Sequence, residues 1–172
     1  ELIRFVEEQC AALDAMADNK AVLFTGPAGS GKTFLAMEAA RREIAMGHRG
    51  RLICFNSLLG RRLKSDMPED ERLTVGTFHS QLRSLTGLRA PRNAEDTFWQ
   101  IELPERALDA LLESWEEPVD FLIIDEIQDL MSEPYLDVLD LMVKGGLKSG
   151  RILFFGDFER QAIFDEGHGR QR

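Results

Sequence analysis

The sequence predicts an α/β fold in which a mostly parallel β-sheet carries helices on both faces. Short apolar segments alternate along the chain with longer amphipathic segments, and this alternation is typical of such sheets. The short segments are apolar at nearly every position, which is the pattern of strands buried on both faces. The 172 residues suffice for a single core, so we expect the whole chain to form one domain.

Each predicted strand is a short run of mainly apolar residues next to turn-forming or charged residues. The first ends at Gly26-Pro27, and the fourth ends at Asp125, the first of a pair of acidic residues. In chain order the strands are predicted over residues 21–25 (AVLFT), 51–55 (RLICF), 73–77 (LTVGT), 121–125 (FLIID) and 151–156 (RILFFG).

The predicted helices fill the intervals between the strands. Gly47 ends the first helix, Pro68 stops the second, and Pro104 occupies the favoured first turn of the fourth. In chain order the helices are predicted over residues 32–46, 58–67, 78–85, 104–115 and 134–144. Residues 86–103 show no regular pattern, and a small insertion or a lid would both fit them.

Charge is unevenly distributed along the chain, whose net charge is −9. Residues 1–92 contain 14 Lys and Arg against 11 Asp and Glu, whereas residues 93–172 contain 7 against 19. A protein this acidic is a poor binder of DNA through its whole surface. Residues 41–64, however, hold seven basic side chains and one acidic one, which fits either a solvated face or a surface for an anionic partner.

No apolar run approaches the roughly 18 residues of a membrane span, so we expect no membrane association. The first ten residues, ELIRFVEEQC, carry acidic side chains and lack the apolar region of a signal peptide. We therefore expect a cytoplasmic protein in which Cys10 and Cys54, far apart in the sequence, are free thiols.

The most specific motif is a glycine-rich segment between the first predicted strand and the first predicted helix. It fits the pattern G-x-x-x-x-G-K-[ST] of a phosphate-binding loop, in the strand–loop–helix context that this loop requires. Backbone N–H groups and the helix N-terminus would hold the phosphates of ATP, Lys32 would reach the β- and γ-phosphates, and the Thr33 hydroxyl would bind Mg²⁺. The predicted ATP-binding residues are Gly26, Pro27, Ala28, Gly29, Ser30, Gly31, Lys32 and Thr33.

Two carboxylates follow the apolar run 121–124. Because ligands of such sheets bind at the carboxyl ends of the strands, we expect Asp125 to lie beside the phosphate loop and to hold Mg²⁺ directly or through water. Glu126 would polarise the attacking water. An acidic N-cap of the next helix would give the same local sequence.

Several motifs along the chain resemble, in their sequence order, the motifs of superfamily 1 helicases of the UvrD and Rep type. GPAGSGKT at 26–33 is similar to the first motif of that family, and DEIQD at 125–129 to its DExQD box. TFHS at 77–80 matches an element of the same family, and GDFERQAIF at 156–164 resembles its GDxxQxIY motif. Gln9 stands where the adenine-reading glutamine of the family lies. The matches span residues 9–164 and imply the N-terminal RecA-like half of such a motor.

The resemblance implies further roles at the nucleotide. Gln9 would hydrogen-bond the adenine edge, and Gln161 would sense the γ-phosphate and couple it to DNA. Lys32, Glu126 and Gln161 are thus the expected catalytic residues. The later motifs of the family, which lie in a second RecA-like domain and include phosphate-sensing arginines, are absent from this chain. Because arginines of this kind contribute about 10³–10⁵ in rate, we expect the chain alone to turn ATP over poorly.

The resemblance also implies a path for single-stranded DNA, with RNA possible. Donors at a helix N-terminus would meet a phosphate, and nearby arginines would add positive charge. The residues expected to contact nucleic acid are Phe55, Asn56, Ser57, Arg61, Thr77, Phe78, His79 and Phe164. The chain departs from the family after Phe164, where an aromatic-Arg-Gly-Ala continuation is replaced by DEGHGRQR.

Two other functions fit part of the sequence. A self-contained P-loop NTPase could act as a switch or a nucleotide kinase without nucleic acid, and a nucleotide-regulated scaffold could dock a partner through the acidic half. Trp99 and Trp115 lie on or beside amphipathic segments and are more typical of core or interface anchors than of base platforms.

Overall fold

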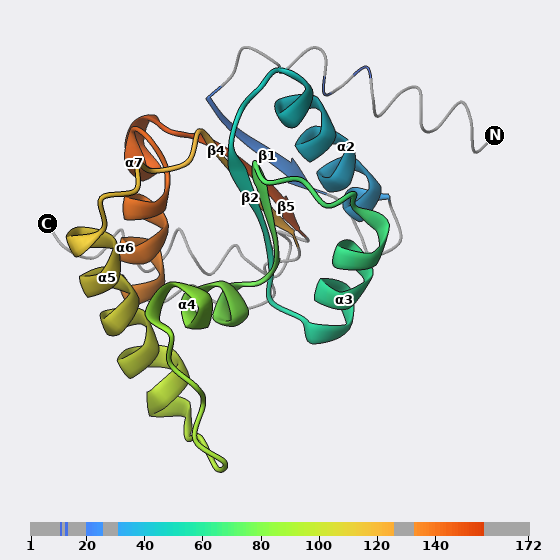
Figure 1. Ribbon diagram of the computed structural model, residues 1–172. Helices are drawn as coiled ribbons and strands as arrows, with labels where there is room; N and C mark the ends of the chain where they lie inside the picture. The colour runs from blue at the N-terminus through green and yellow to red at the C-terminus, as the bar shows by residue number, and fades with distance from the viewer. Residues whose placement is uncertain (1–10, 12, 14–19, 26–30, 126–132, 157–172) are drawn as a thin grey trace, which may run out of the picture.

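The computed structural model describes residues 11, 13, 20–25, 31–125 and 133–156. Strands and helices alternate along most of this part of the chain (Figure 1). The elements are β1 (Ala21–Thr25), α2 (Lys32–Ala45), β2 (Gly50–Cys54), α3 (Ser57–Asp66), β3 (Leu73–Thr77), α4 (Phe78–Thr86), η1 (Phe98–Glu102), α5 (Leu103–Glu113), β4 (Phe121–Asp125), α6 (Glu133–Met142), α7 (Gly146–Ser149) and β5 (Arg151–Gly156).

The five strands form one sheet in which every pairing is parallel. Their order is β1-β5-β4-β2-β3, so β5, the last of the described strands, lies between β1 and β4. The other pairings join β4 to β2 and β2 to β3. The predicted α/β fold with a parallel sheet is therefore confirmed.

Helices cover both faces of the sheet, as predicted (Figure 1). Alternate residues of each strand point to opposite faces. On β4, Phe121 and Ile123 pack in the core beneath α2 and α3, whereas Leu122 and Ile124 pack in the core shared with α4, α5 and α6. All five residues of β4 are buried, which explains why its sequence is apolar without alternation.

Each predicted helix is present with its ends within two residues of the prediction, and three further differences concern β2, α7 and residues 86–103. Strand β2 begins and ends one residue earlier than predicted, so that Phe55 lies just beyond it. The short helix α7 was not predicted. The irregular segment 86–103 leads from α4 into η1, a five-residue π-helical turn that continues directly into α5.

Segment 86–103 packs against the second core although its sequence shows no periodicity. Gly87 ends α4 with a φ of 69°, in the left-handed region that favours glycine. Leu88, Ala90 and Ala94 then pack against this core, and Phe98 is buried in it. Among the described residues, no helix combines the length and apolar character needed to cross a membrane.

Candidate functional site

The carboxyl ends of all five strands meet at one edge of the sheet. Thr25 pairs with Gly156, Asp125 pairs with Phe155 and with Cys54, and Cys54 pairs with Thr77. This is the edge at which open parallel sheets bind their ligands. The residues that end these strands, where several of the sequence motifs begin, therefore share one edge of the sheet.

Helix α2 begins where the phosphate loop was predicted to end. Gly31 precedes the helix with a φ of 81°, a left-handed conformation that side chains with a Cβ disfavour. Lys32, the first helical residue, is 7% exposed, and Thr33 follows half-buried. The first turn of α2 contains no acidic residue, so its N-terminal N–H groups and dipole favour an anion.

Asp125 ends β4 and is completely buried. Burying a carboxylate in an apolar strand is costly unless positive charge or hydrogen-bond donors compensate it, which suits a group that serves a metal or a phosphate. The predicted position of Asp125 beside the phosphate loop stays a prediction, because residues 26–30 lie outside the described residues. Strand β5 lies between β4 and β1, the strand that leads into the loop, so β1 and β4 are about 10 Å apart, twice the usual strand spacing.

A buried amine, a neighbouring hydroxyl and a buried carboxylate at one sheet edge form a donor set that fits Mg²⁺ and the phosphates of a nucleotide. The described residues of this set are Gly31, Lys32, Thr33 and Asp125. Outside the described residues lie Gln9, Gly26, Pro27, Ala28, Gly29, Ser30, Glu126, Gln161 and Phe164, and their predicted roles stay predictions.

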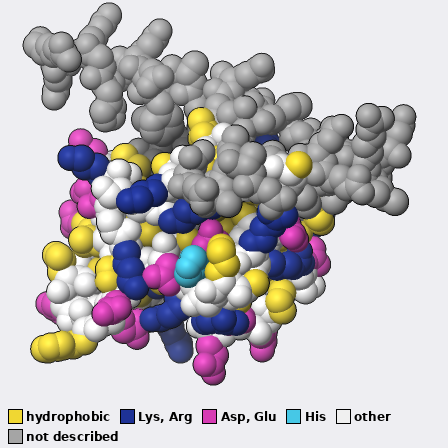
Figure 2. All heavy atoms as spheres, turned by 90° about the horizontal axis from the view of Figure 1, so that it is seen from above, with side chains coloured by type: hydrophobic (Ala, Val, Ile, Leu, Met, Phe, Trp, Pro, Cys, Tyr) yellow, Lys and Arg dark blue, Asp and Glu magenta, His cyan; other side chains and the backbone are white. Residues whose placement is uncertain are grey.

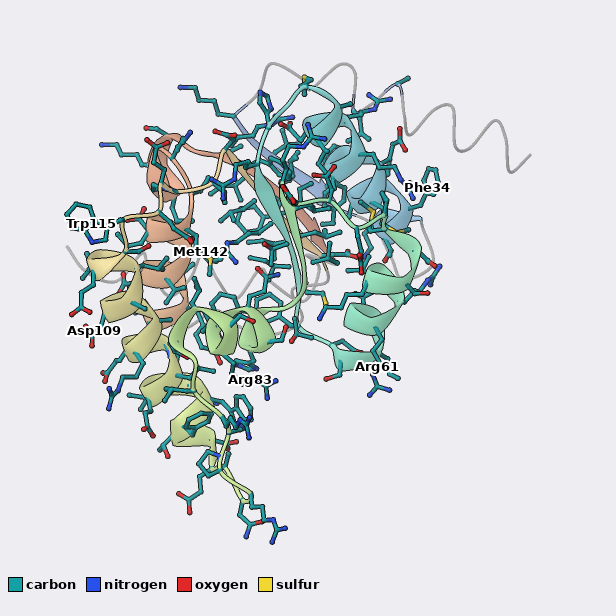
Figure 3. All side chains as sticks on the ribbon, viewed as in Figure 1. Phe34, Arg61, Arg83, Asp109, Trp115 and Met142 are labelled. Atoms are coloured by element: carbon teal, nitrogen blue, oxygen red, sulfur yellow. The ribbon has the colours of Figure 1, made fainter. Side chains whose placement is uncertain are left out.

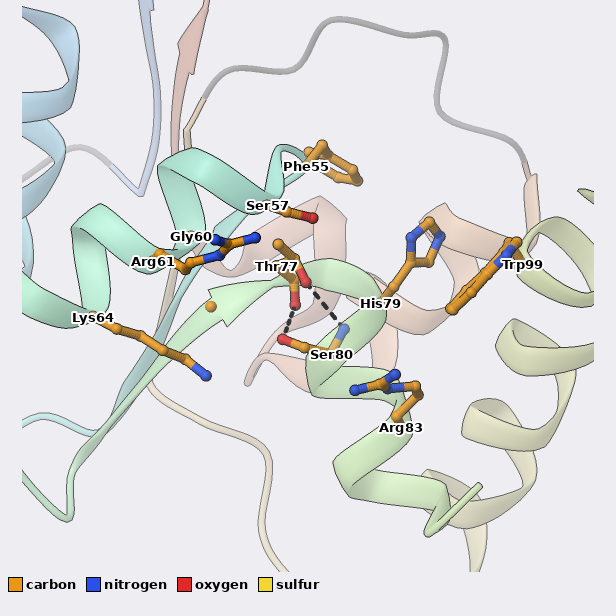
Figure 4. A pocket seen from close by; sticks show the side chains of 11 residues that line it. Phe55, Ser57, Gly60, Arg61, Lys64, Thr77, His79, Ser80, Arg83 and Trp99 are labelled. Atoms are coloured by element: carbon orange, nitrogen blue, oxygen red, sulfur yellow. Dashed lines mark hydrogen bonds between the residues drawn. The ribbon is translucent and has the colours of Figure 1, made fainter. Parts of the chain in front are cut away.

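A groove of about 440 Å³ opens beside this edge, where α3 and α4 begin (Figure 4). Its walls come from α3 on one side and η1 on the other, with the junction of β3 and α4 between them. The lining residues are Phe55, Ser57, Gly60, Arg61, Lys64, Gly76, Thr77, His79, Ser80, Arg83 and Trp99. Five residues that the resemblance assigned to nucleic acid thus line one groove: Phe55, Ser57, Arg61, Thr77 and His79.

Capping hydrogen bonds fix the starts of both helices at the groove. The side-chain oxygen of Asn56 accepts hydrogen bonds from the backbone N–H groups of Leu58 and Leu59 at 2.8 and 3.2 Å. Thr77 Oγ1 accepts a hydrogen bond from the Ser80 N–H at 3.2 Å, and Ser80 Oγ donates to the Thr77 carbonyl at 2.8 Å. Asn56 is exposed next to the groove but does not line it.

Phe78 does not fit the contact that the resemblance implied. Its side chain is 0% exposed and packs in the core against Phe55 and Tyr135, with ring centroids 5.6 and 4.9 Å apart. The side chains of neighbouring residues in the first turn of α4 point in different directions, so His79 reaches the groove while Phe78 supports it from within.

His79 is held in the groove by a chain of hydrogen bonds. Its Nε2 lies 2.7 Å from the Tyr135 hydroxyl, which donates to the Trp99 carbonyl at 3.0 Å. Because the hydroxyl has one proton and gives it to that carbonyl, Nε2 must be the donor in the first bond. Burial, assisted by the charge of Arg83, lowers the pKa of His79 and thereby favours the neutral ring.

Three cations face this groove, and among the described residues that line it there is no carboxylate. Arg61 and Lys64 lie one turn apart on α3, and Arg83 lies one turn beyond His79 on α4. All three are exposed, and Figure 3 shows Arg61 and Arg83 on the two neighbouring helices. Positive charge with aromatic side chains is the combination that binds the backbone and bases of single strands.

Sequence reasoning missed four polar or aromatic lining residues. Lys64 follows Arg61 by three positions and Arg83 follows His79 by four, so helical spacing could have identified both. Ser80 belongs to the TFHS element itself. Trp99 was interpreted as a core or interface anchor, because its position in the groove depends on the π-helical turn η1, which no sequence pattern indicated.

The chain was also compared with known proteins. A family model described as an AAA domain matches residues 9–164. No curated protein matches the chain.

Proposed function

The chain belongs to the AAA domain family, whose members have the P-loop NTPase fold, and from this premise we propose a more specific function. We propose that it is the ATP-binding half of a superfamily 1 DNA helicase or translocase similar to UvrD and Rep. Such a protein couples the hydrolysis of Mg-ATP to movement on single-stranded DNA. Its second RecA-like domain would be supplied by the parent protein.

The observation that carries this proposal is the position of the groove relative to the nucleotide residues. Asp125 ends β4, and the neighbouring strand β2 runs through Cys54 into Phe55 at the groove. A switch or a nucleotide kinase needs no groove of three cations and three aromatic rings at this edge. A motor needs such a groove, because ATP hydrolysis at its nucleotide site must be coupled to the nucleic-acid strand along which it moves.

The nucleotide residues have defined parts in this function. Lys32 would neutralise phosphate charge, Thr33 and Asp125 would hold Mg²⁺, and Glu126 would orient the attacking water. Bound Mg²⁺ supplies the charge stabilisation that phosphoryl transfer requires. An arginine from the second domain would complete the site, so the isolated chain should hydrolyse ATP slowly.

Steady-state ATP turnover with and without single-stranded DNA tests the proposal, together with direct binding of Mg-ADP and of a labelled oligonucleotide. We expect both ligands to bind and turnover to remain near background. Fast turnover stimulated by DNA would show that the chain is self-sufficient and would contradict the half-motor. Binding of nucleotide without binding of DNA would favour the switch.

A second experiment separates a nucleotide-driven function from a scaffold. Lys32→Ala removes the amine from the phosphate site and should abolish nucleotide binding. Lys148→Ala, an exposed substitution on α7, serves as the control and should bind nucleotide normally. If the Lys32→Ala protein retained full function in the cell, the nucleotide would be dispensable and the scaffold would gain support.

A further inference from the structure

Trp99 lies outside the motifs that suggested a motor, in the segment whose sequence shows no regular pattern. A tryptophan beside an amphipathic helix usually belongs to the core. Trp99 is instead half-buried and forms the wall of the groove opposite α3 (Figure 4). Its ring centroid lies 5.0 Å from that of His79, with the two planes inclined by 46°.

The protein holds Trp99 firmly in this position. Phe98 is buried in the core and meets the Trp99 ring edge-on, with centroids 5.0 Å apart and planes at 79°. The Trp99 carbonyl accepts the hydrogen bond from Tyr135, which also accepts one from His79. A ring already ordered in the free protein costs little entropy when a ligand binds to it.

The charges in the groove indicate how a single strand of nucleic acid would lie in it. Arg61 and Lys64 extend from the opposite wall, and Arg83 lies on α4 near His79 (Figure 4). Phosphates are attracted to these cations, whereas bases prefer the faces of aromatic rings. A strand with its phosphates along the cations would turn a base towards Trp99.

We propose that Trp99, placed by the π-helical turn η1 next to His79, is a stacking platform for a nucleobase of single-stranded nucleic acid bound in this groove. This inference rests on the proposed function and adds to it a residue that the motifs do not contain. Stacking uses the face that every base has, so this contact would be independent of sequence.

Tryptophan fluorescence tests the contact directly, because the chain contains two tryptophans. Trp115 is fully exposed near the far end of α5 and does not line the groove (Figure 3). Trp115→Phe leaves Trp99 as the reporter, and oligothymidylate should quench its emission in a saturable way. The mirror variant Trp99→Phe leaves Trp115, whose emission should change little in the same titration.

Affinity measurements then separate the contribution of the bases to binding from that of the sugar-phosphate backbone. Oligothymidylate is compared with an oligomer of the same length whose sugars carry no bases. Trp99→Ala should weaken the binding of oligothymidylate by roughly 5- to 150-fold, the range of one base–aromatic stack, and should leave the abasic oligomer nearly unaffected. Trp99→Leu preserves apolar contact with Phe98 but has no aromatic face, so it should behave like Trp99→Ala while remaining folded.

The outcomes distinguish this inference from the proposed function. If the wild-type protein binds neither oligomer, both the proposed function and the stacking role of Trp99 are contradicted. If it binds both and Trp99→Leu binds oligothymidylate as tightly as the wild type, the groove holds nucleic acid and the stacking role of Trp99 is refuted. Unquenched Trp99 emission at saturating oligothymidylate would refute it as well.

Discussion

At the scale of single residues, buried charges at the two ends of the sheet have different surroundings. Asp125 lies buried at the carboxyl edge, near which the proposed nucleotide residues Lys32 and Thr33 begin α2. Glu43, 4% exposed, lies near the amino ends of the strands and binds the Arg151 side chain at 3.2 Å and the His48 ring at 2.6 Å. Through Arg151, Glu43 ties the end of α2 to the start of β5.

On the face seen from above in Figure 2, basic and acidic side chains are interspersed.

Removing Glu43 should therefore destabilise the fold. Glu43→Ala leaves the side chain of Arg151, which is 21% exposed, without this carboxylate, and we expect a loss of about 3 kcal/mol in the free energy of unfolding measured with urea. Glu38→Ala on the same helix is the matched control. Its carboxylate meets Arg41 and Arg42 at 3.7 and 3.6 Å near the surface, so its loss should cost less than about 1 kcal/mol. Equal losses in the two variants would contradict this account of the amino edge.

His79 should make stability depend on pH. Burial lowers its pKa below the ordinary value of 6.5, so the unfolded chain takes up a proton before the folded protein does. The contribution of His79 to the free energy of unfolding is complete above pH 6.5, and it is lost as the pH falls through the lowered pKa of the folded protein. Urea unfolding across this range should show a smaller pH dependence in His79→Asn than in the wild type. A steeper dependence in the variant would refute a lowered pKa.

At the scale of elements, helix caps and one glycine set the positions of the strands and of the groove. Asn56 and Thr77 begin α3 and α4 directly after β2 and β3, which places both helix starts at the carboxyl edge. At the opposite end of β2, Gly50 lies beneath the ring of Phe121 on β4. A Cβ at Gly50 would come within 2.3 Å of that ring.

Gly50→Ala should consequently separate β2 from β4. Because overpacking of a core costs about 1–3 kcal/mol, we expect a decrease of this size in the free energy of unfolding. Phe121→Leu provides the space that the added methyl group needs. In a double-mutant cycle, the Gly50→Ala substitution should cost less in the Phe121→Leu background than in the wild type. An equal cost in both backgrounds would mean that the ring is not the obstacle.

At the scale of the whole molecule, the uneven charge along the chain reappears as a local basic groove in a protein of net charge −9. In the proposed function, binding of an anionic nucleic-acid strand would therefore depend on this groove rather than on the general surface. The first half of the chain supplies Arg61, Lys64 and Arg83, whereas the acidic half supplies β4, α6 and β5.

Salt dependence should reveal the contribution of each cation. For single strands, the logarithm of the binding constant falls with the logarithm of salt concentration by about 0.7 for each phosphate contacted. Arg61→Ala should reduce the magnitude of this slope by roughly 0.7, as measured by fluorescence anisotropy of a labelled oligonucleotide. Lys148→Ala, outside the groove, should leave the slope unchanged. Identical slopes for Arg61→Ala and wild type would remove Arg61 from the phosphate path.

The sequence by itself determined the features that depend on neighbouring residues. Continuous apolar runs define buried strands, glycines and prolines end the helices, and G-x-x-x-x-G-K-T stands between a strand and a helix. These signals are local, since they reflect side-chain periodicity and backbone freedom over a few residues. They predicted the five described strands, four of them to the residue, and they predicted that helices lie on both faces of the sheet.

Only the tertiary structure decided which distant residues meet. Strand pairing places β5 between β1 and β4, so Asp125 at the end of β4 is separated from β1 by one strand. Packing buried Phe78, and it brought His79 to Tyr135 and to Trp99 on η1. Such contacts depend on how helices far apart in the sequence pack on a shared core, and no short pattern encodes that arrangement. The groove therefore appears only in the folded molecule, although five of its lining residues could be named in advance from the motifs.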